Sequence, residues 1–395
     1  MSLPPLILKK NEDRRLRAGH LWVFSNEVDI ARTPLKAFTP GQAVEIKASN
    51  GHLIGTGYVN PNSLISARIL SRDPQHPPGR SLLVHRLNIA LALRERLYPK
   101  PFYRLVFGES DGLPGLVVDR YDAVLVAQIT TAGMELMKAD IVAALEKVIK
   151  PSAILFRNDV GVRELEGLPL YIETALGTVP DTVKLEEHGL SFEVPLGGGQ
   201  KTGWFFDQHD NRGKLLRYIG GRRVLDVFSY VGAWGIQSAA HGASEVLCVD
   251  SSAAALEWVA RNAAANQVSV TGREADAFDA LKALREAGEK FDVVVLDPPA
   301  FVKRRKDLIK GKEAYHRLNQ LAMQLLTRDG LLISCSCSHH MPAADLLDAI
   351  QSASRHLGRE AQVLEQGGQA PDHPVHPAIP ETAYLKAFYV RVVDA

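Results

Sequence analysis

The chain has 395 residues, of which 46% are hydrophobic and 23% are charged. It is therefore long enough for two or three domains and too apolar to be intrinsically disordered. The formal net charge of +1 hides an uneven distribution: residues 1–100 carry 15 basic and 7 acidic side chains, residues 101–200 carry 8 and 15, and the rest is balanced. A basic N-terminal part indicates a charged partner, which the neutral total alone would argue against.

Signals for membrane insertion, secretion and metal binding are not evident. Apolar runs fall short of the ~18 residues that a membrane helix needs. The first residues, MSLPPLILKKNEDRR, place their charges after the apolar stretch, unlike a signal peptide. The three cysteines, Cys248, Cys335 and Cys337, give neither a disulfide framework nor metal-ligand spacing. We expect no membrane partner, no metal and a cytoplasmic location.

Residues 1–72 form the first predicted domain. Short apolar runs (QAVEIKA, LIGTGYV, LISARIL) are separated by turn-forming SNGH and NPNS, a pattern typical of a small β-barrel or β-sheet. Basic residues flank these runs: Lys9, Lys10, Arg14, Arg15, Arg17, Arg68 and Arg72. They fit either a nucleic-acid surface or an ordinary solvated one. Residues 73–80, DPQHPPGR, are typical of a linker.

Residues 81–180 form a predicted α+β middle domain. Apolar spacing predicts a helix over 82–98, three strands within 104–130, a helix over 134–149 and a strand over 153–159. The acidity of this block either keeps it away from nucleic acid or reflects an exposed face, and its sequence does not distinguish the two.

Residues 181–395 form the third predicted domain. A hairpin over 183–196, turning at His188-Gly189, is followed by regular alternation of strands and helices. Such alternation indicates a mostly parallel sheet with helices on both faces. The last two runs, QVLEQ and AYLKAFYVRVVD, have no helix between them and predict an antiparallel end. The fold class is therefore α/β, with an N-terminal β-barrel-like domain and a small α+β middle domain.

Acidic residues recur at the ends of the predicted strands in the third domain. They are Asp226, Asp250, Asp276 and Asp297. Ligands of doubly wound sheets bind at this edge, and four unpaired buried carboxylates would cost too much to serve folding alone. Helix N-caps would explain Asp250 and Asp276 at most.

The loops around these acids favour a nucleoside cofactor without a phosphate tail, such as S-adenosylmethionine. DVFSYVGAWG (226–235) is not a GxGxxG fingerprint, and the chain has no P-loop. Asp250 is placed to accept ribose hydroxyls, and Asp276-Ala277 to meet an adenine edge. The segment 197–212, GGGQKTGWFFDQHDNR, crowds polar side chains at a helix entry, where they would bind the amino-acid end of the cofactor.

A basic loop follows the fourth strand-end acid. Asp297-Pro298-Pro299-Ala300-Phe301 leads into VKRRKDLIKGK (302–312), which holds six basic residues and one acid. Lysine and arginine neutralise phosphates, so this position predicts a nucleic-acid substrate. A Pro-stiffened turn and a solvated loop are the alternatives.

Cys337 is the candidate nucleophile. It lies nearer the carboxyl end of its strand than Cys335 and is followed by Ser338, His339 and His340. Neighbouring cations or imidazoles would favour the thiolate that nucleophilic catalysis needs. Cys248 and Cys335 fit buried core positions.

Several motifs together resemble one family. GWFFDQHDNR (203–212), VLDVFSYVGAWG (224–235), VLCVDSS (246–252), VVLDPPAF (294–301) and SCS (336–338) resemble the PUA-domain-bearing, Rossmann-like methyltransferases that make 5-methylcytosine in 23S ribosomal RNA. The N-terminal GHLWVFSNEV and PGQAVEIKASNGHLIGTGYVNPNS resemble that family's PUA domain. His209 departs from the usual FDQRDNR, where an arginine is usual. The thiol followed by Ser-x-x-Met, Cys337, is the reactive one by similarity.

The resemblance implies S-adenosylmethionine as methyl donor, large-subunit ribosomal RNA as partner, and a set of site residues. Cys337 and Asp297 are the expected catalytic residues. The expected cofactor-binding residues are Phe206, Asp207, Gln208, Arg212, Asp226, Phe228, Tyr230, Gly232, Asp250, Ser251, Asp276, Ala277 and Asp297. The expected substrate-binding residues are Pro298, Pro299, Phe301, Lys303, Arg304, Arg305 and Lys306.

In the expected mechanism Cys337 attacks carbon 6 of a cytosine. The base that completes the reaction is left open between His339, His340 and water, because Ala300 stands where some RNA cytosine methyltransferases have a second cysteine. The alternatives are an N-methyltransferase of RNA guanine or adenine and a non-catalytic RNA-binding or ribosome-assembly protein. A homodimer would be unsurprising.

Overall fold

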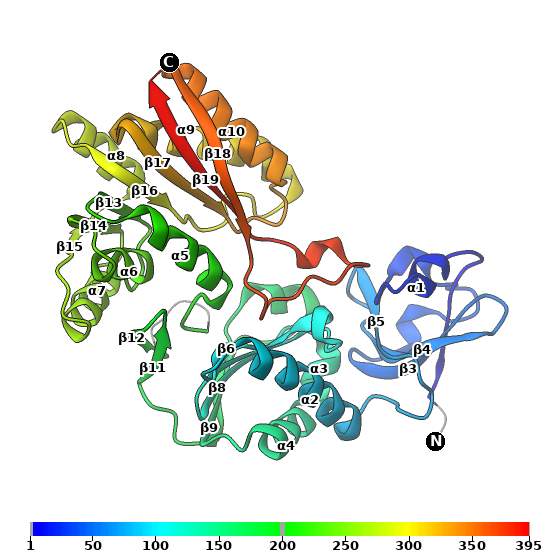
Figure 1. The fold of residues 1–395 in the computed structure, drawn as a ribbon. Helices are drawn as coiled ribbons and strands as arrows, with labels where there is room; N and C mark the ends of the chain where they lie inside the picture. The colour runs from blue at the N-terminus through cyan, green and yellow to red at the C-terminus, as the bar shows by residue number, and fades with distance from the viewer. Residues whose placement is uncertain (1–2, 198–201, 395) are drawn as a thin grey trace. The chain divides into compact units, whose positions relative to one another are not determined.

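The chain forms two compact units, which a computed structural model describes over residues 3–197 and 202–394 (Figure 1). The N-terminal unit comprises Met1–Val183, Pro195–Phe206 and Pro371–Thr382, and the C-terminal unit comprises Lys184–Val194, Asp207–Ala370 and Ala383–Ala395. Within the polar segment 197–212, residues 198–201 lie outside the described residues.

The N-terminal unit begins with a five-stranded sheet of order β1-β3-β4-β5-β2. Its strands are β1 (Pro5–Ile7), β2 (Trp22–Phe24), β3 (Gln42–Lys47), β4 (Leu53–Val59) and β5 (Ile65–Ser71), and the short helix α1 spans Arg14–Arg17. β1 and β3 are parallel, whereas the other neighbours are antiparallel. The three apolar runs recognised in the sequence are β3, β4 and β5, which confirms the strand-and-turn interpretation.

A second five-stranded sheet, of order β10-β9-β8-β7-β6, completes this unit. Its strands are β6 (Phe102–Phe107), β7 (Leu116–Tyr121), β8 (Val124–Ile129), β9 (Ala153–Asn158) and β10 (Tyr171–Gly177). The helices are α2 (Arg80–Leu97), α3 (Ala132–Leu136) and α4 (Lys138–Ile149). Apolar side chains of α2 and α4 form one core with this sheet. The helix expected over 134–149 is divided at Met137 into α3 and α4.

Buried polar contacts join the two sheets of the N-terminal unit. The Tyr58 hydroxyl donates to the Pro114 carbonyl oxygen at 2.7 Å, and the Asn60 amide donates to Glu166 at 2.8 Å. Arg68 pairs with the same Glu166 at 3.0 Å and is only 8% exposed. The grouping of Arg68 with the basic surface is therefore wrong, because this guanidinium neutralises a buried carboxylate of the middle block. The boundaries 1–72, 81–180 and 181–395 stay predictions.

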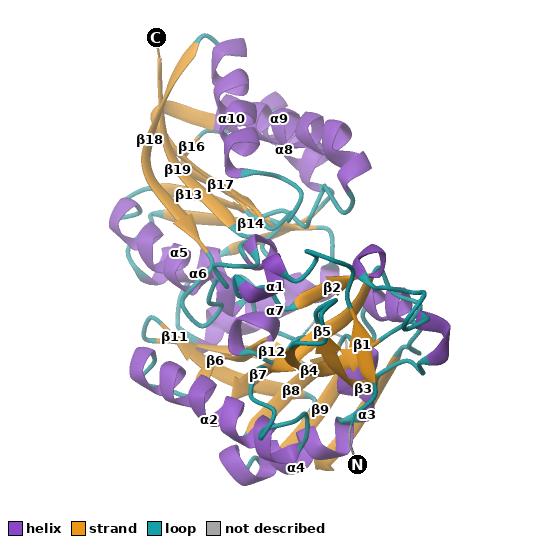
Figure 2. Cartoon of the chain, turned by 90° about the vertical axis from the view of Figure 1, so that its right-hand side faces the viewer, coloured by secondary structure: helices purple, strands orange, loops and turns teal. Residues whose placement is uncertain are grey.

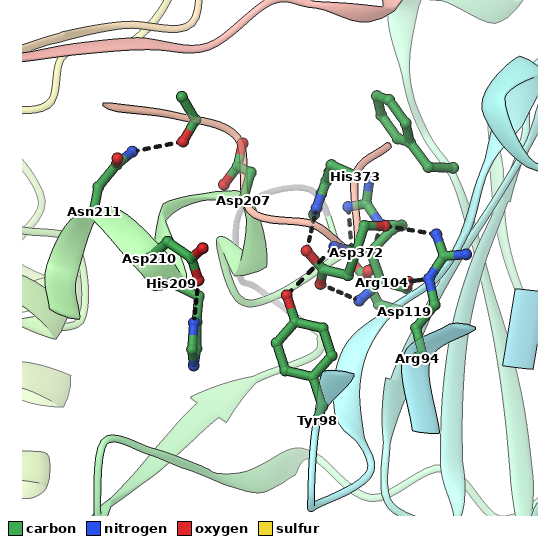
Figure 3. A network of polar contacts seen from close by, with 12 residues as sticks. Arg94, Tyr98, Arg104, Asp119, Asp207, His209, Asp210, Asn211, Asp372 and His373 are labelled. Carbon is green, nitrogen blue, oxygen red and sulfur yellow. Dashed lines mark hydrogen bonds and ion pairs between the residues drawn. The ribbon is translucent and has the colours of Figure 1, made fainter. Parts of the chain in front are cut away.

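Residues 371–382, between the last two strands of the chain, also belong to the N-terminal unit. Asp372 is fully enclosed there: its carbonyl oxygen accepts from Arg94 at 2.6 Å, and its carboxylate accepts from the Arg104 amide at 2.8 Å (Figure 3). Ile379 packs into the core of the first sheet. Residues 371–382 are therefore held by buried contacts within the N-terminal unit.

The C-terminal unit contains a seven-stranded sheet of order β15-β14-β13-β16-β17-β19-β18. Its strands are β13 (Arg223–Val227), β14 (Glu245–Asp250), β15 (Thr271–Glu274), β16 (Phe291–Leu296), β17 (Leu326–Ser336), β18 (Arg359–Gly368) and β19 (Lys386–Asp394). The first five are parallel, and β19 runs antiparallel to both β17 and β18. This confirms the doubly wound α/β prediction and its antiparallel end.

Helices cover both faces of this sheet. The helices are α5 (His209–Leu215), α6 (Ala233–Ala240), α7 (Ala253–Ala265), α8 (Ala277–Glu286), α9 (Leu308–Leu325) and α10 (Ala343–His356). One apolar core contains α8, α9 and α10 and another contains α5, α6 and α7 (Figure 2). The predicted hairpin is β11 (Thr182–Glu187) and β12 (Leu190–Pro195). Within the described part of the chain, the helices lack the length and apolarity needed to cross a membrane.

Candidate active site

Three of the four strand-end acids meet at one edge of the seven-stranded sheet. Strand β13 lies between β14 and β16, and all three run parallel, so their carboxyl ends coincide. Asp226 lies one residue before the end of β13, Asp250 ends β14, and Asp297 directly follows β16. Ligands of such sheets bind at this edge.

Asp226 is fully buried and half satisfied. Its Oδ2 accepts from the Gly235 amide at 2.9 Å, while Oδ1 has no hydrogen-bond partner among the described residues. Burial raises the pKa of Asp226 to about 7. The nearby charges of Asp297 and Asp250 also raise this pKa, whereas the hydrogen bond from Gly235 lowers it. A buried carboxylate oxygen without a donor is costly, so it is a place where a ligand that donates hydrogen bonds would be stabilised.

The loop after β13 is held in an unusual backbone conformation. Phe228, Tyr230 and Gly232 have φ values of 67°, 49° and 88°. For the two non-glycine residues this costs on the order of 1–3 kcal/mol each, and such strain clusters at functional sites. The Tyr230 amide donates to Asp250 Oδ2 at 2.8 Å, which ties this loop to the next strand end.

Asp250 and Asp276 differ in their structural roles. Asp276 is the N-cap of α8, where its carboxylate accepts from the Phe278 amide at 2.9 Å, so the capping alternative holds for it. Asp250 does not cap α7, whose N-cap is Ser252. Ser251 is exposed and Ala277 is buried. The contacts expected of Asp250, Ser251, Asp276 and Ala277 with ribose and adenine stay predictions.

Asp297 lies in a polar network with Gln208, which directly precedes α5, and with Trp234 of α6. Its carboxylate accepts from Gln208 Nε2 at 2.8 Å and from Trp234 Nε1 at 3.1 Å. Burial raises the pKa of Asp297 to about 6, although the Trp234 hydrogen bond opposes this shift. Trp234 was not identified from the sequence, where its signal is a tryptophan between the small residues Ala233 and Gly235.

The predicted segment around Gln208 makes internal contacts. Asn211 Nδ2 donates to Gln208 Oε1 at 2.6 Å. It also donates to the Gly368 carbonyl oxygen at 2.9 Å (Figure 3). The buried Arg212 donates to Glu187 at 2.7 Å, which links α5 to the end of β11. Asp207 accepts from the Tyr384 hydroxyl, while its Oδ1 is buried without a partner among the described residues.

Phe206 lies in the N-terminal unit, where its ring packs 5.3 Å from that of Tyr121. His209, which replaces the usual arginine, has its ring centroid 4.4 Å from that of His188, with the two rings tilted by 35°. Its Nδ1 lies 2.9 Å from the Asp210 carboxylate (Figure 3). Gln208 and Arg212 have partners of their own, so their contacts with a cofactor, like that of Phe206, stay predictions.

Cys337 is the one cysteine of the three that is not fully buried. It follows the last residue of β17, and its thiol lies 3.8 Å from the Pro298 carbonyl oxygen, in the loop that begins at Asp297. Burial raises the pKa of both Cys248 and Cys335 above that of a free thiol, which suits the core positions expected for them. The ambiguity between Cys335 and Cys337 is thereby reduced to one accessible thiol.

Hydroxyl groups brace the turn that carries Cys337. Ser336 Oγ donates to the Tyr315 hydroxyl at 2.8 Å, and Ser338 Oγ lies 3.1 Å from that same hydroxyl. The Val302 amide donates to Ser338 Oγ at 3.2 Å, which connects the turn to the start of the basic loop. Tyr315, on α9, was not identified from the sequence because it is more than twenty positions from the residues that it joins.

The basic loop places its cations in solvent. Lys303, Arg304, Arg305 and Lys306 are all exposed, as is Pro299, whereas Pro298 is buried. The half-buried Phe301 packs 4.9 Å from the Tyr315 ring. The exposed cations therefore follow directly on residues that contact the Cys337 turn.

Comparisons with known proteins agree with this geometry. A model of a PUA-like domain matches residues 6–72, and a model of an S-adenosylmethionine-dependent methyltransferase matches residues 170–391. Relatives named Ribosomal RNA large subunit methyltransferase I are 38% identical in Salmonella arizonae, over 99% of this chain and 98% of that protein, and 39% identical in Erwinia tasmaniensis, over 98% and 99%. The chain belongs to the ribosomal RNA large subunit methyltransferase I family.

Family membership makes the chain an S-adenosylmethionine-dependent methyltransferase and confirms the PUA-like and Rossmann-like domains. The crystal structure of SMU.776 complexed with SAH has the same fold, with a TM-score of 0.85 at 20% identity, over 98% of this chain and all of that one. Three buried oxygens near the strand ends that have no donor among the described residues fit the cofactor: Asp207 Oδ1, Asp226 Oδ1 and Ser229 Oγ can accept from its ammonium and hydroxyl groups.

Proposed function

We propose that this chain methylates carbon 5 of a cytosine in large-subunit ribosomal RNA, with Cys337 as the nucleophile. The observation that carries the proposal is the half-buried Cys337 thiol, 3.8 Å from the Pro298 carbonyl oxygen of the Asp297 loop. The relatives, which are named for ribosomal RNA of the large subunit, support the choice of substrate.

Asp207, Asp226 and Ser229, together with Asp250 at the end of β14, would hold the cofactor. S-adenosylmethionine, when bound, supplies an electrophilic methyl group. Asp226 is suited to the ammonium end because its Oδ1 has no donor among the described residues and a bound cation would favour its buried carboxylate form.

Cys337 would act on the pyrimidine ring. Its thiolate adds to carbon 6, and the electron pair of the 5,6 double bond makes carbon 5 nucleophilic. Carbon 5 would then take the methyl group, whose bond to the sulfonium sulfur would break and leave a neutral thioether. A base then removes the proton of carbon 5, the double bond reforms, and the bond between carbon 6 and sulfur breaks to return the thiolate. Atoms and charges balance without any redox partner.

Asp297 would orient the cytosine. A carboxylate has about four acceptor positions, of which Gln208 and Trp234 use two. The others can accept from the exocyclic amine of the base. The exposed cations of 303–306, on the same loop, would bind RNA phosphates. A cytoplasmic location and a homodimer stay predictions.

Replacement of Cys337 tests the proposal. We expect Cys337→Ala to lower methyl transfer to ribosomal RNA by at least about 1,000-fold while S-adenosylmethionine binding is retained, because a nucleophile is lost and the cofactor site is not. Cys335→Ala, two residues earlier and buried, is the matched control and should stay active.

The product separates the alternatives. RNA mass spectrometry should find 5-methylcytosine. Methylated guanine or adenine amines, or transfer that persists in Cys337→Ala, would overturn the proposal in favour of N-methylation. If the native chain does not bind S-adenosylmethionine, the alternative of a non-catalytic RNA-binding protein would be favoured.

A further inference from the structure

We infer that Lys386 is a positioning residue for Cys337: its ammonium holds the turn that carries the thiol and favours the thiolate form. The inference rests on the proposed role of Cys337 as nucleophile. Lys386 lies near the carboxyl end of the chain, 49 positions from Cys337, and no spacing or motif in the sequence connects the two.

Strand pairing brings Lys386 to Cys337. Lys386 is the first residue of β19 and lies opposite Ser336, the last residue of β17, in the antiparallel ladder. Cys337 is the next residue after Ser336. Nζ of Lys386 donates to the Ser338 carbonyl oxygen at 2.6 Å and to the Tyr384 carbonyl oxygen at 2.8 Å. The ammonium is thus bonded to the residue that immediately follows the thiol.

The environment of this ammonium is unusual for a lysine. Lys386 is 9% exposed, and its hydrogen bonds to Ser338 and Tyr384 both lead to neutral carbonyl oxygens. Lysines are almost never this buried unless a charged partner compensates them. Burial lowers the pKa of Lys386 to about 8, and the charge of Cys337 is the influence that opposes this shift. A thiolate at Cys337 therefore stabilises the ammonium.

Such a coupling is reciprocal. If the thiolate stabilises the ammonium, the ammonium stabilises the thiolate by the same free energy. Tyr315 on α9 and Cys335 on β17 interact with the charge of Cys337, and Asp297 after β16 interacts with Cys335. These three groups carry negative charge when they ionise. The imidazoles of His339 and His340 follow the thiol in the chain but are exposed and half-buried, whereas Lys386 is a buried cation that is hydrogen-bonded to the turn.

The charge of Lys386 determines how the reactivity of Cys337 depends on pH. The ammonium is present below about pH 8 and is lost above it. Its assistance to the thiolate is therefore available at neutral pH and disappears as the pH rises through about 8.

The test measures the reactivity of Cys337 without RNA or cofactor. The rate of Cys337 alkylation by iodoacetamide is followed from pH 5 to pH 10 by peptide mass spectrometry in the native chain, Lys386→Met and Lys386→Arg. We expect Lys386→Met to react about tenfold more slowly at pH 7 and to shift the midpoint up by about one pH unit, since one unit corresponds to a tenfold change in the thiolate fraction. Lys386→Arg, which keeps the charge, should restore much of the rate.

An unchanged alkylation profile in folded Lys386→Met would overturn the inference, because a purely structural lysine would not shift the midpoint. If Lys386→Met does not fold, the second measurement is the titration of Lys386 by NMR of ¹³C-labelled lysine in the native chain and in Cys337→Ser. Removal of the thiolate should lower the lysine midpoint, and an equal midpoint would refute the coupling. The proposed function fails separately, if Cys337→Ala retains methyl transfer.

Discussion

Gly235 offers a direct test of how the cofactor edge is packed. It lies within α6, and a Cβ atom built on it would be 2.4 Å from Cys248 Sγ and 3.2 Å from Asp226 Oδ2. Ordinary contacts at such a position are 3.4–4 Å. Gly235 is therefore needed because α6 approaches β13 and β14 closely, and its amide thereby reaches Asp226.

The expected loss of folding stability in Gly235→Ala is the overpacking cost minus the gain in helix propensity. Overpacking a rigid core costs roughly 1–3 kcal/mol, and the 2.4 Å approach to a short buried side chain places this site at the upper end. Alanine in a helix interior recovers about 1 kcal/mol of propensity. We expect a net loss of about 2 kcal/mol, or roughly 4–8 °C in the Tm of a unit of this size.

Differential scanning fluorimetry of single and double variants is the assay. Cys248→Ala removes the clashing sulfur, so Gly235→Ala combined with it should be less destabilised than the sum of the two single variants, by about 1 kcal/mol or more. Gly161→Ala, where a Cβ meets nothing within 4 Å, is the matched control. A Tm for Gly235→Ala equal to or above that of the native chain would refute the packing argument.

Three further predictions concern charge. The pKa of Asp226 is raised from 3.8 to about 7 in the folded chain, so the folded state binds the proton more tightly and loses stability as the pH rises from about 4 to 7. Asp226→Asn should therefore make the Tm of the ligand-free chain less dependent on pH between pH 5 and 8, and it should weaken S-adenosylmethionine binding at least about tenfold in calorimetry. A pH dependence of the Tm equal to that of the native chain would contradict this prediction. Trp234→Phe removes a hydrogen-bond donor to Asp297, so the pKa of Asp297 should rise above about 6. The acidic limb of the pH profile of kcat/KM should then move to higher pH. An acidic limb at the same pH as in the native chain would argue against Asp297 as the titrating group. Replacement of the four cations of 303–306 by serine should reduce the slope of log K for RNA against log salt by roughly 3, at about 0.7 per single-strand phosphate contact, whereas the exposed Arg328 serves as a control whose loss leaves the slope unchanged.

The α/β architecture could be predicted because its signals are local. Alternating apolar runs and Gly or Pro turns identified β3, β4 and β5 and the strands that end near Asp226, Asp250 and Asp297. The accessible thiol could be singled out because Cys337 follows a strand whereas Cys335 lies within it.

Residues that depend on long-range pairing could not be predicted. Trp234, Tyr315 and Lys386 reach the site only through the order of the strands and the packing of α6 and α9, which a periodic pattern does not encode. For Asp276 the sequence left a cofactor contact and a helix N-cap both open, and the structure shows the capping bonds with α8.

The charge difference between residues 1–100 and residues 101–200 also reflects pairing between distant parts of the sequence. Two acids of the middle block neutralise buried cations of residues 1–100: Asp111 pairs with Arg94, and Glu166 pairs with Arg68. The acidic excess of residues 101–200 therefore serves folding in part, and the basic excess of residues 1–100 overstates the cationic surface.

The central claim is a covalent bond between Cys337 and carbon 6 of a cytosine. RNA that carries 5-fluorocytosine at the target tests it most directly, because fluorine at carbon 5 cannot leave as a proton does and the adduct should persist. With S-adenosylmethionine, the native chain should form a complex that survives denaturation, with the RNA attached to the Cys337 peptide, and Cys337→Ala should form none. Methylation of ordinary RNA without any such complex on the fluorinated RNA would contradict the account.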